Sequence, residues 1–448
     1  MRKIFIKFKE NALSSYWFFP ATLFLLSFLL AWSTISLDLM FQEDIKEFIQ
    51  EAFFFLDLSV ETARIYLSTI IGAVITVVGV VFSLTILTVS TASRQFGPRV
   101  LNNFMRDKGN QLTLGIYTAT FVYASTILIS LYEKDESFIP YLSVFLCYSM
   151  ALLCIAFLIY YIHHIPESLR IENIIHQIAM KALKLVERKF PQEEKLENWE
   201  ILDSPEQMAL FKELERNIQQ KIVVSSVGYI QAVDVEGLAR WAVEKDALVY
   251  ICAQPGDFCG GQSVIVKTNK NLNPKEIAEV KYFYEFGMGR TLPQNLMYLL
   301  SQLMEVAIRS LSKSMNDPIT AMSCLDWLEA CLLKLIDCDS GHSIIHDKNR
   351  QPRILLRPLS LEEVLEHMEK GLRTHVSRDF AVSMHFLKSL RRMSARARSE
   401  GQKKAIESIA LSLMDSCGRQ EHSKRDMERL VEIFRSFSTN KLESTHEH

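Results

Sequence analysis

The sequence predicts a polytopic α-helical membrane protein with four transmembrane helices and a mixed α+β cytoplasmic region, in which a small β-barrel or sandwich precedes a helical domain. Three observations predict this fold class. Nearly all long uncharged runs lie before Pro166, and nearly all dense charge lies after it. The loops between the uncharged runs alternate between basic and acidic. Short strand-like runs after residue 217 give way to helical periodicity beyond Pro274.

The four predicted spans are stretches that lack Asp, Glu, Lys and Arg for about 20 residues or more, roughly what a helix needs to cross a ~30 Å hydrocarbon core. They cover residues 16–37, 65–93, 112–132 and 137–164. A soluble core helix rarely stays apolar on all sides for this length. We therefore expect residues 1–164 to form a four-helix transmembrane domain.

The loop charges orient these spans. The residues before the first span and the loop after the second are basic, whereas the first and third loops are acidic. Basic loops stay in the cytoplasm, so we expect both termini there. The first apolar run is too long for a typical signal peptide and has no convincing cleavage site, so we expect it to be an uncleaved span.

The second span carries small residues mainly every three or four positions: Ser68, Gly72, Thr76, Gly79, Ser83 and Ser90. Such a stripe lets helix backbones approach closely, so the simplest interpretation is a helix-packing seam. The alternative is that this face lines a polar pathway in a homo-oligomer, with Thr76, Ser83 and Thr85 contributing hydroxyls. No ionised residue lies mid-span, which disfavours a proton-coupled pump but permits a passive pore.

Basic residues directly follow the second span. The simplest interpretation of Arg94 and Arg99 is a positive-inside anchor near anionic headgroups. The sharper alternative places both arginines at the cytoplasmic mouth of a pore, where they would attract anions.

The cytoplasmic part is expected to contain a helical linker (165–217), a small β-rich domain (218–270) and a mainly α-helical domain (271–448). Strand-like runs in the second of these segments cover residues 222–224, 229–233, 247–251 and 263–266, and a short helix can form over 234–244. Turn signals separate the runs, which is typical of a barrel or sandwich of about 50 residues.

The helical domain contains two candidate sites. In Asn316-Asp317-Pro318 the simplest interpretation is a helix start that Asp317 caps. The alternative is a polar cluster of Arg290, Gln294 and Asp317 that binds a ligand or a neighbouring subunit.

The cysteines of this domain recur every seven residues, at Cys324, Cys331 and Cys338. This spacing favours core packing over a zinc site, whose ligands must crowd around one ion. Cys338, His342 and His346 are a weaker metal candidate, because this segment reads as a hairpin turning at 348–350.

Several motifs resemble a known group of bacterial proteins. They are Tyr16-Trp17-Phe18-Phe19-Pro20, Gly79-Val80-Val81-Phe82-Ser83, Gln95-Phe96-Gly97-Pro98-Arg99, Gly228-Tyr229-Ile230-Gln231, Pro255-Gly256-Asp257-Phe258, Arg290-Thr291 and Asn316-Asp317-Pro318. Together they resemble the predicted membrane proteins grouped as domain of unknown function 2254. Asn295 departs from the family, which tends to have Asp there. The resemblance implies a bacterial inner-membrane location and brings no activity with it.

Several motifs that mark known classes of enzyme or metal site are missing from the sequence. We find no H-E-x-x-H, G-x-S-x-G, Walker or paired CxxC motif, so we expect no enzyme, metal or cofactor. Lys+Arg 50 against Asp+Glu 52 argues against a nucleic-acid partner. The leading hypothesis is a homo-oligomeric, channel-like pore in the lipid bilayer with a cytoplasmic regulatory domain. The competing hypothesis is a membrane-anchored sensor or scaffold.

Overall fold

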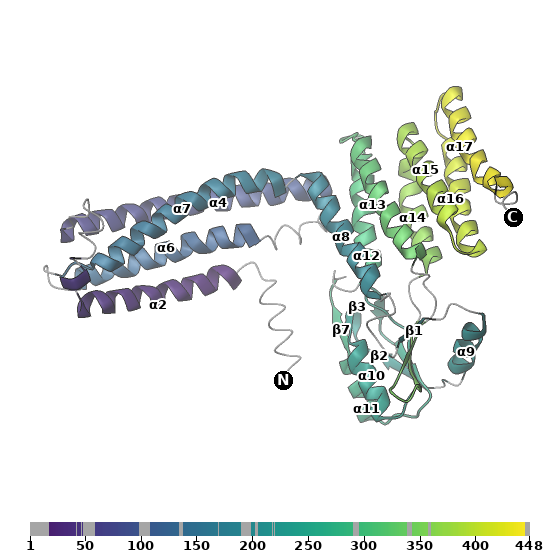
Figure 1. Cartoon of the computed structure of the whole chain (residues 1–448), viewed down its shortest axis with the longest axis horizontal. Coiled ribbons are helices and arrows are strands. Elements are labelled where there is room, and N and C mark those ends of the chain that lie inside the picture. Colours follow the sequence, from purple (N-terminus) through teal and green to yellow (C-terminus); the bar gives the residue numbers. More distant parts are fainter. Residues whose placement is uncertain are drawn as a thin grey trace. The chain divides into compact units, whose positions relative to one another are not determined.

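The structure is a computed structural model of all 448 residues. It describes residues 18–41, 43–45, 47, 59–97, 108–133, 138–168, 170–189, 199–201, 205–216, 218, 220–289, 295–337, 343–356 and 360–443. The chain divides into two compact units, Met1–Asn173 (unit 1) and Ile174–His448 (unit 2), whose elements Figure 1 labels.

Unit 1 contains four helices that are long and apolar enough to cross a membrane. They are α2 (Phe18–Met40), α4 (Val60–Phe96), α6 (Lys108–Glu133) and α7 (Tyr141–Ser168). Each overlaps one predicted span, so the prediction of four apolar helices is confirmed. Helix α6 packs against the other three and is the most buried of them. A Cβ added at Gly115 of α6 would lie 2.6 Å from Leu23 Cδ1 of α2, so glycine leaves room for this side chain where the two helices meet.

Tyrosine hydroxyls connect the helices of unit 1. Tyr123 of α6 bonds the hydroxyl of Thr34 on α2 at 3.0 Å, and Tyr117 of α6 donates to the Cys154 carbonyl of α7 at 2.7 Å. Tyr161 of α7 donates to the Val81 carbonyl of α4 at 2.9 Å. Because hydrocarbon offers no other partners, such bonds help to fix which helices pair.

Asp38 near the end of α2 is 1% exposed. Its carboxylate accepts hydrogen bonds from the backbone N–H groups of Leu142 (2.9 Å) and Ser143 (3.0 Å) and from the Ser143 hydroxyl (2.6 Å). These groups belong to the first turn of α7, where N–H groups have no partner within the helix. Asp38 therefore caps a helix that lies about a hundred residues further along the chain.

Unit 2 begins with a helical and β region. Its elements are α8 (Ile171–Lys189), β1 (Trp199–Ile201), α9 (Pro205–Arg216), β2 (Gln220–Val224), β3 (Val227–Val233), α10 (Val235–Glu244), β4 (Val249–Ile251), β5 (Phe258–Gly260), β6 (Ser263–Thr268), α11 (Pro274–Tyr282) and β7 (Tyr284–Gly287). All four predicted strand runs and the helix between them are confirmed. Asp234 starts α10 by accepting a bond from the Gly237 N–H at 2.9 Å.

The described strands form two sheets rather than one closed barrel. A six-stranded sheet has the order β1-β8-β9-β4-β6-β2, and a three-stranded sheet has the order β5-β3-β7. Strands β8 (Ser343–His346) and β9 (Pro352–Leu356) come from much later in the chain, and β9 pairs parallel to β4. The predicted hairpin around 348–350 is thus confirmed, whereas the barrel or sandwich is not.

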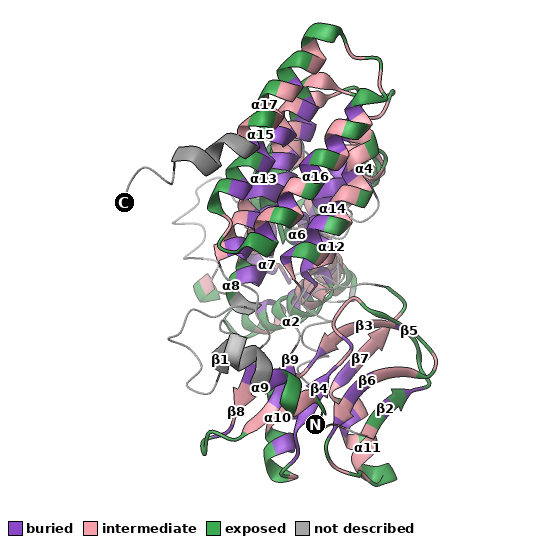
Figure 2. Cartoon of the chain, turned by 90° about the vertical axis from the view of Figure 1, so that its right-hand side faces the viewer, coloured by how far each residue is buried: buried purple, intermediate pink, exposed green. Residues whose placement is uncertain are grey.

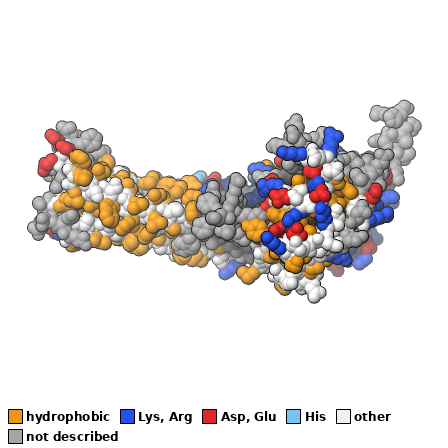
Figure 3. Space-filling model, turned by 90° about the horizontal axis from the view of Figure 1, so that it is seen from below, with side chains coloured by type: hydrophobic (Ala, Val, Ile, Leu, Met, Phe, Trp, Pro, Cys, Tyr) orange, Lys and Arg blue, Asp and Glu red, His pale blue; other side chains and the backbone are white. Residues whose placement is uncertain are grey.

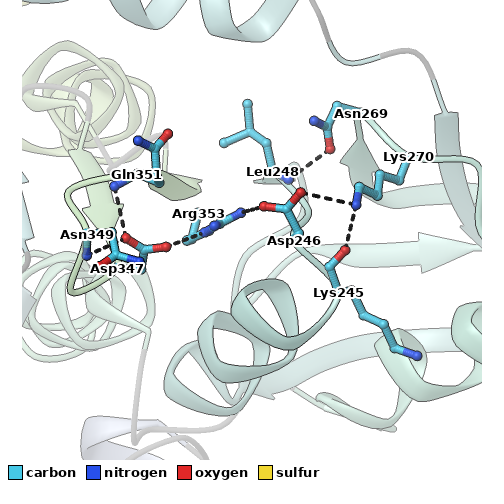
Figure 4. Close-up of polar contacts among 9 residues, drawn as sticks. All are labelled: Lys245, Asp246, Leu248, Asn269, Lys270, Asp347, Asn349, Gln351 and Arg353. Atoms are coloured by element: carbon cyan, nitrogen blue, oxygen red, sulfur yellow. Dashed lines mark hydrogen bonds and ion pairs between the residues drawn. The ribbon is translucent and has the colours of Figure 1, made fainter.

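An ion-pair network, which we call the Arg353 clamp, ties this hairpin to the sheet (Figure 4). The Arg353 guanidinium donates to Asp347 at 2.9 Å and to Asp246 at 2.7 Å. Lys270 donates to the Lys245 carbonyl at 2.8 Å. Asp246 has a φ of 46°, a conformation that Asp tolerates better than most residues. The clamp joins the end of α10, the end of β6 and the hairpin.

The rest of unit 2 is helical. It contains α12 (Leu296–Ser310), α13 (Pro318–Asp337), α14 (Leu361–Val376), α15 (Phe380–Arg396), α16 (Glu400–Gly418) and α17 (Lys424–Glu443). Buried residues, purple in Figure 2, recur along these helices. Cys324 is 0% and Cys331 is 2% exposed, which confirms core packing for both; Cys338 and His342 lie outside the described residues.

Candidate functional site

The small-residue stripe of α4 has no partner among the described residues of its own chain. Gly72, Thr76, Gly79 and Ser83 are all exposed. A Cβ added at Gly72 or Gly79 would meet nothing within 4 Å. The hydroxyl of Thr76 donates to the Gly72 carbonyl at 2.7 Å, and that of Ser83 to the Gly79 carbonyl at 2.8 Å. The stripe therefore faces away from the bundle, with its hydroxyl protons bonded to its own helix.

Thr85 differs from these four residues. It is 8% exposed, donates to the Val81 carbonyl at 2.8 Å and bonds the Tyr161 hydroxyl of α7. Its surroundings are those of a packing contact inside one bundle, and the structure does not bring it to the exposed stripe.

The basic end of α4 is partly described. Arg94 is exposed in the last turn, and the helix ends at Gly97, whose φ of 97° suits glycine and whose N–H donates to the Ser93 carbonyl at 3.1 Å. Arg99 lies outside the described residues, so a ring of both arginines stays a prediction.

Asp317 caps α13, as the simpler interpretation predicts. Its carboxylate accepts from the Thr320 N–H at 3.1 Å and from the Thr320 hydroxyl at 2.6 Å. Its own N–H donates to the carbonyl of Ser310, the last residue of α12. Asn295 caps the other end of α12, and 15 residues of helix are about 22 Å long.

Arg290 and Gln294 lie outside the described residues. Gln294 adjoins Asn295, and the structure places Asn295 at the opposite end of α12 from Asp317. The polar cluster of the three residues stays a prediction.

Two of the motif segments, 228–231 and 255–258, contact the described residues on either side of 290–294. The Gln231 side chain donates to the Gly289 carbonyl at 3.1 Å. A Cβ added at Gly256 would lie 1.9 Å from the Asn295 amide nitrogen, so glycine is required where this turn meets α12. Asn295 accepts from the Tyr298 N–H at 2.9 Å, a capping bond that Asp would also make. The departure from the family thus preserves this cap.

An exposed apolar face on the three-stranded sheet was not predicted. Val227 is 71% and Phe258 is 57% exposed, and the Tyr229 and Phe258 rings lie 5.1 Å apart in an edge-to-face arrangement. Tyr229 pairs directly with Phe258 between β3 and β5, which explains why the rings share one face. The available sequence signal was the alternation of Val227 and Tyr229, which places both on one face of a strand.

Metal ligation finds no support in the part of the chain that the structure describes. No group of three or more His, Cys, Asp or Glu side chains gathers there in a way that could hold an ion. His346 of the weaker metal candidate lies in β8.

Among the described residues, the two units expose different kinds of side chain. On the face that Figure 3 shows, hydrophobic side chains cover the helices of unit 1, and Lys, Arg, Asp and Glu are intermixed on unit 2. In unit 1 the exposed side chains include Leu25 (62%), Trp32 (66%) and Ile159 (67%). Apolar exposure on this scale is what a helix in contact with lipid shows.

Comparison with known proteins gives a family but no activity. The family model described as "Predicted membrane protein (DUF2254)" matches residues 13–392. Uncharacterized proteins of Mycobacterium tuberculosis and Mycobacterium bovis are 30% identical to this chain over 280 residues, which is 60% of this chain and 51% of each relative. The chain spans about half the length of these curated relatives. No solved structure matches it.

Proposed function

The chain belongs to the DUF2254 family of predicted membrane proteins, and we propose that it forms a homo-oligomeric, channel-like pore in the bacterial cytoplasmic (inner) membrane. Unit 2 is the cytoplasmic regulatory domain in this proposal, and both termini lie in the cytoplasm. The basic residues before α2 and after α4 support that orientation, because basic segments stay on the cytoplasmic side.

One observation carries the proposal. The stripe of Gly72, Thr76, Gly79 and Ser83 is exposed on a 37-residue helix, with open space where side chains at the glycines would be. Small residues offer lipid chains no particular favourable contact, whereas they let the backbone of a neighbouring helix approach closely. In an oligomer that encloses an axis, the same face supplies hydroxyl and carbonyl oxygens to a path without ionised groups.

Arg94 gives the proposed path a charged end. It is exposed in the last turn of α4, at the opposite end of the helix from Glu61. A basic mouth on the cytoplasmic side would raise the local concentration of anions. We therefore expect the pore to favour anions over cations, and expect Arg94→Gln to reduce that preference.

The test is reconstitution of the purified full chain in planar bilayers. We expect conductance from the wild type, and loss of conductance with retention of the oligomer in Gly79→Leu, because the larger side chain would fill the path. Ala73→Leu, at the neighbouring exposed position, is the matched control and should conduct. A wild type that is silent and monomeric in mild detergent would contradict the proposal; loss of assembly in Gly79→Leu would make the stripe a packing seam.

A second candidate function is a membrane-anchored sensor or scaffold. The observation that favours it is the exposed apolar face of Val227, Tyr229 and Phe258 on unit 2. A sensor would give no conductance from the wild type, and Phe258→Ser would alter partner binding while Gly79→Leu would not.

A further inference from the structure

We propose that a groove at the start of α4 binds the headgroup of one membrane phospholipid that carries a primary ammonium and a phosphodiester, as phosphatidylethanolamine does. The binding groups are Glu61 and Arg64, and the Tyr132 ring helps to hold Arg64 in place. The proposal requires α4 and α6 to cross a bilayer but does not require a pore, so it is independent of the conductance experiment.

The groove lies between two neighbouring helices of unit 1. It is open, has a volume of about 560 Å³, and is lined by Glu61, Arg64, Ile65, Ser68, Thr69 and Tyr132. Arg64 near the start of α4 donates from Nη2 to the Leu131 carbonyl near the end of α6 at 2.7 Å. The contact places both helix ends at the same membrane face, where headgroups lie.

Other groups than a carboxylate hold Arg64 in position among the described residues. Its guanidinium carbon lies 4.6 Å from the centre of the Tyr132 ring, and its Nε is buried without a hydrogen-bond partner. A guanidinium that a carbonyl and a ring hold in place keeps its charge and has further N–H groups for an anion. A phosphodiester satisfies both the charge and the fork geometry of arginine.

Glu61 supplies the negative charge of the groove, at the depth where the ammonium group of the lipid would lie. It is exposed and lies three residues before Arg64, about 4.5 Å along the helix axis toward the water. Ile65 follows on the exposed side, where acyl chains begin, and is 62% exposed. The order negative, positive, apolar along α4 thus complements ammonium, phosphate and acyl chain in a phospholipid.

The remaining lining residues shape the groove. The hydroxyls of Ser68 and Thr69 donate to the carbonyls of Arg64 (2.7 Å) and Ile65 (2.8 Å), so they contribute space rather than free donors. Tyr132 is 66% exposed at the end of its span, as expected for an aromatic residue at the level of the headgroups.

These groups also discriminate between phospholipids. Glu61 can accept hydrogen bonds from the N–H groups of a primary ammonium. Phosphatidylglycerol offers no cation to this carboxylate, and the quaternary ammonium of phosphatidylcholine has no N–H donor. Phosphatidylethanolamine therefore satisfies both charges of the groove.

The experiment is native mass spectrometry of the full chain in mild detergent, with equal amounts of the three phospholipids carrying identical acyl chains. We expect the wild type to retain phosphatidylethanolamine preferentially. Glu61→Gln should lower its ratio to phosphatidylglycerol at least about fivefold, the factor that ~1 kcal/mol gives. Arg64→Gln should lower retention of both lipids, and Arg64→Lys should restore part of it.

One control variant and one fallback complete the design. Arg419→Gln removes an exposed arginine of unit 2 and should leave lipid retention unchanged. If Arg64→Gln fails to fold, Glu61→Gln still decides, because Glu61 is exposed. Equal retention of the three lipids by the wild type, an unchanged ratio in Glu61→Gln, or wild-type retention by a folded Arg64→Gln would each overturn the proposal.

Discussion

Among the described residues, most polar contacts between the helices of unit 1 are made by hydroxyls and by the buried carboxylate of Asp38, with Arg64 as an exception, whereas in unit 2 many are made by ion pairs near the surface. Tyr123 and Tyr161 bond partners inside the bundle, while Arg392 and Arg396 of α15 pair with carboxylates of α13 from half-exposed positions. The difference follows from the two solvents. Water weakens an exposed ion pair, and hydrocarbon offers no alternative partner to a helix that loses a hydrogen bond.

The comparison implies that a polar substitution should cost more in unit 1 than a similar one in unit 2. The strongest test is Asp38→Ala, which leaves two backbone N–H groups and the Ser143 hydroxyl without their acceptor. At about 1–3 kcal/mol for each unpaired buried group, we expect a loss of about 3 kcal/mol or more. Thermal unfolding of the full chain in mild detergent measures it. Asp44→Ala, at an exposed position, is the control and should change little; equal effects of the two would contradict the assignment of Asp38 as a cap.

Unit 2 should be most sensitive to apolar truncation instead. Ile230 in β3 is 0% exposed within the core of the β region. We expect Ile230→Ala to lower the free energy of unfolding of unit 2 by about 2–5 kcal/mol. Hydrogen exchange of the strand amides in the full chain is the readout, and Val227→Ala, at an exposed position of the same strand, should have little effect. Loss of protection in the helices of unit 1 would show that the two units do not unfold separately.

Removal of a single hydroxyl group tests the polar contacts of unit 1 with a smaller expected effect. Tyr161→Phe removes the bonds to the Val81 carbonyl and to Thr85 while keeping the ring. Interhelical hydrogen bonds in membranes contribute about 0.6–1.7 kcal/mol, so a loss in this range is expected from detergent unfolding. Tyr160→Phe, at a position that is 44% exposed, is the matched control. A larger loss from the control would place the important contact elsewhere on α7.

The smallest effect is expected from the Arg353 clamp, and it should depend on pH. Arg353 lowers the pKa of Asp246 from its ordinary value of 3.8, and the Gln351 N–H together with Arg353 lowers that of Asp347. A carboxyl whose pKa is lowered by folding stabilises the fold above its ordinary pKa, and this contribution disappears as pH falls through the lowered value.

The stability difference between wild type and Arg353→Gln should therefore be present at pH 7 and shrink below about pH 4, the ordinary range of Asp. Urea unfolding of unit 2 in the full chain at several pH values measures it. A difference that does not change between pH 7 and pH 3 would mean that Arg353 acts through packing alone.

The elements with short-range signals could be predicted from the sequence. Length and missing charge identified α2, α4, α6 and α7, and Asp317-Pro318 marked the start of α13. The turn at 348–350 also followed from its own residues. In each case the cause lies within one helix or one turn, so neighbouring residues were sufficient.

Pairings between distant segments could not be predicted in this way. Nothing in the residues of β4 identifies β9 as its parallel neighbour, because that pairing depends on chain segments about a hundred residues apart. The small barrel or sandwich was expected because the strand runs were recognised without the late hairpin that extends their sheet.

The candidate site shows the same limit. Spacing identified the stripe of Gly72, Thr76, Gly79 and Ser83, but whether it is covered depends on the other helices. Thr85 lies only two residues beyond Ser83 and is buried against Tyr161. Asp38 and Arg64 lie just outside the predicted spans, although both contact a second helix.

The cap that Asp38 makes has a consequence for biosynthesis. A ribosome completes α2 long before it reaches Ser143, 105 residues later. During that interval the carboxylate must remain solvated or find a temporary partner, since the turn that it will bind has not yet been made. A chain truncated before α7 would therefore leave the Asp38 carboxylate without these three hydrogen bonds.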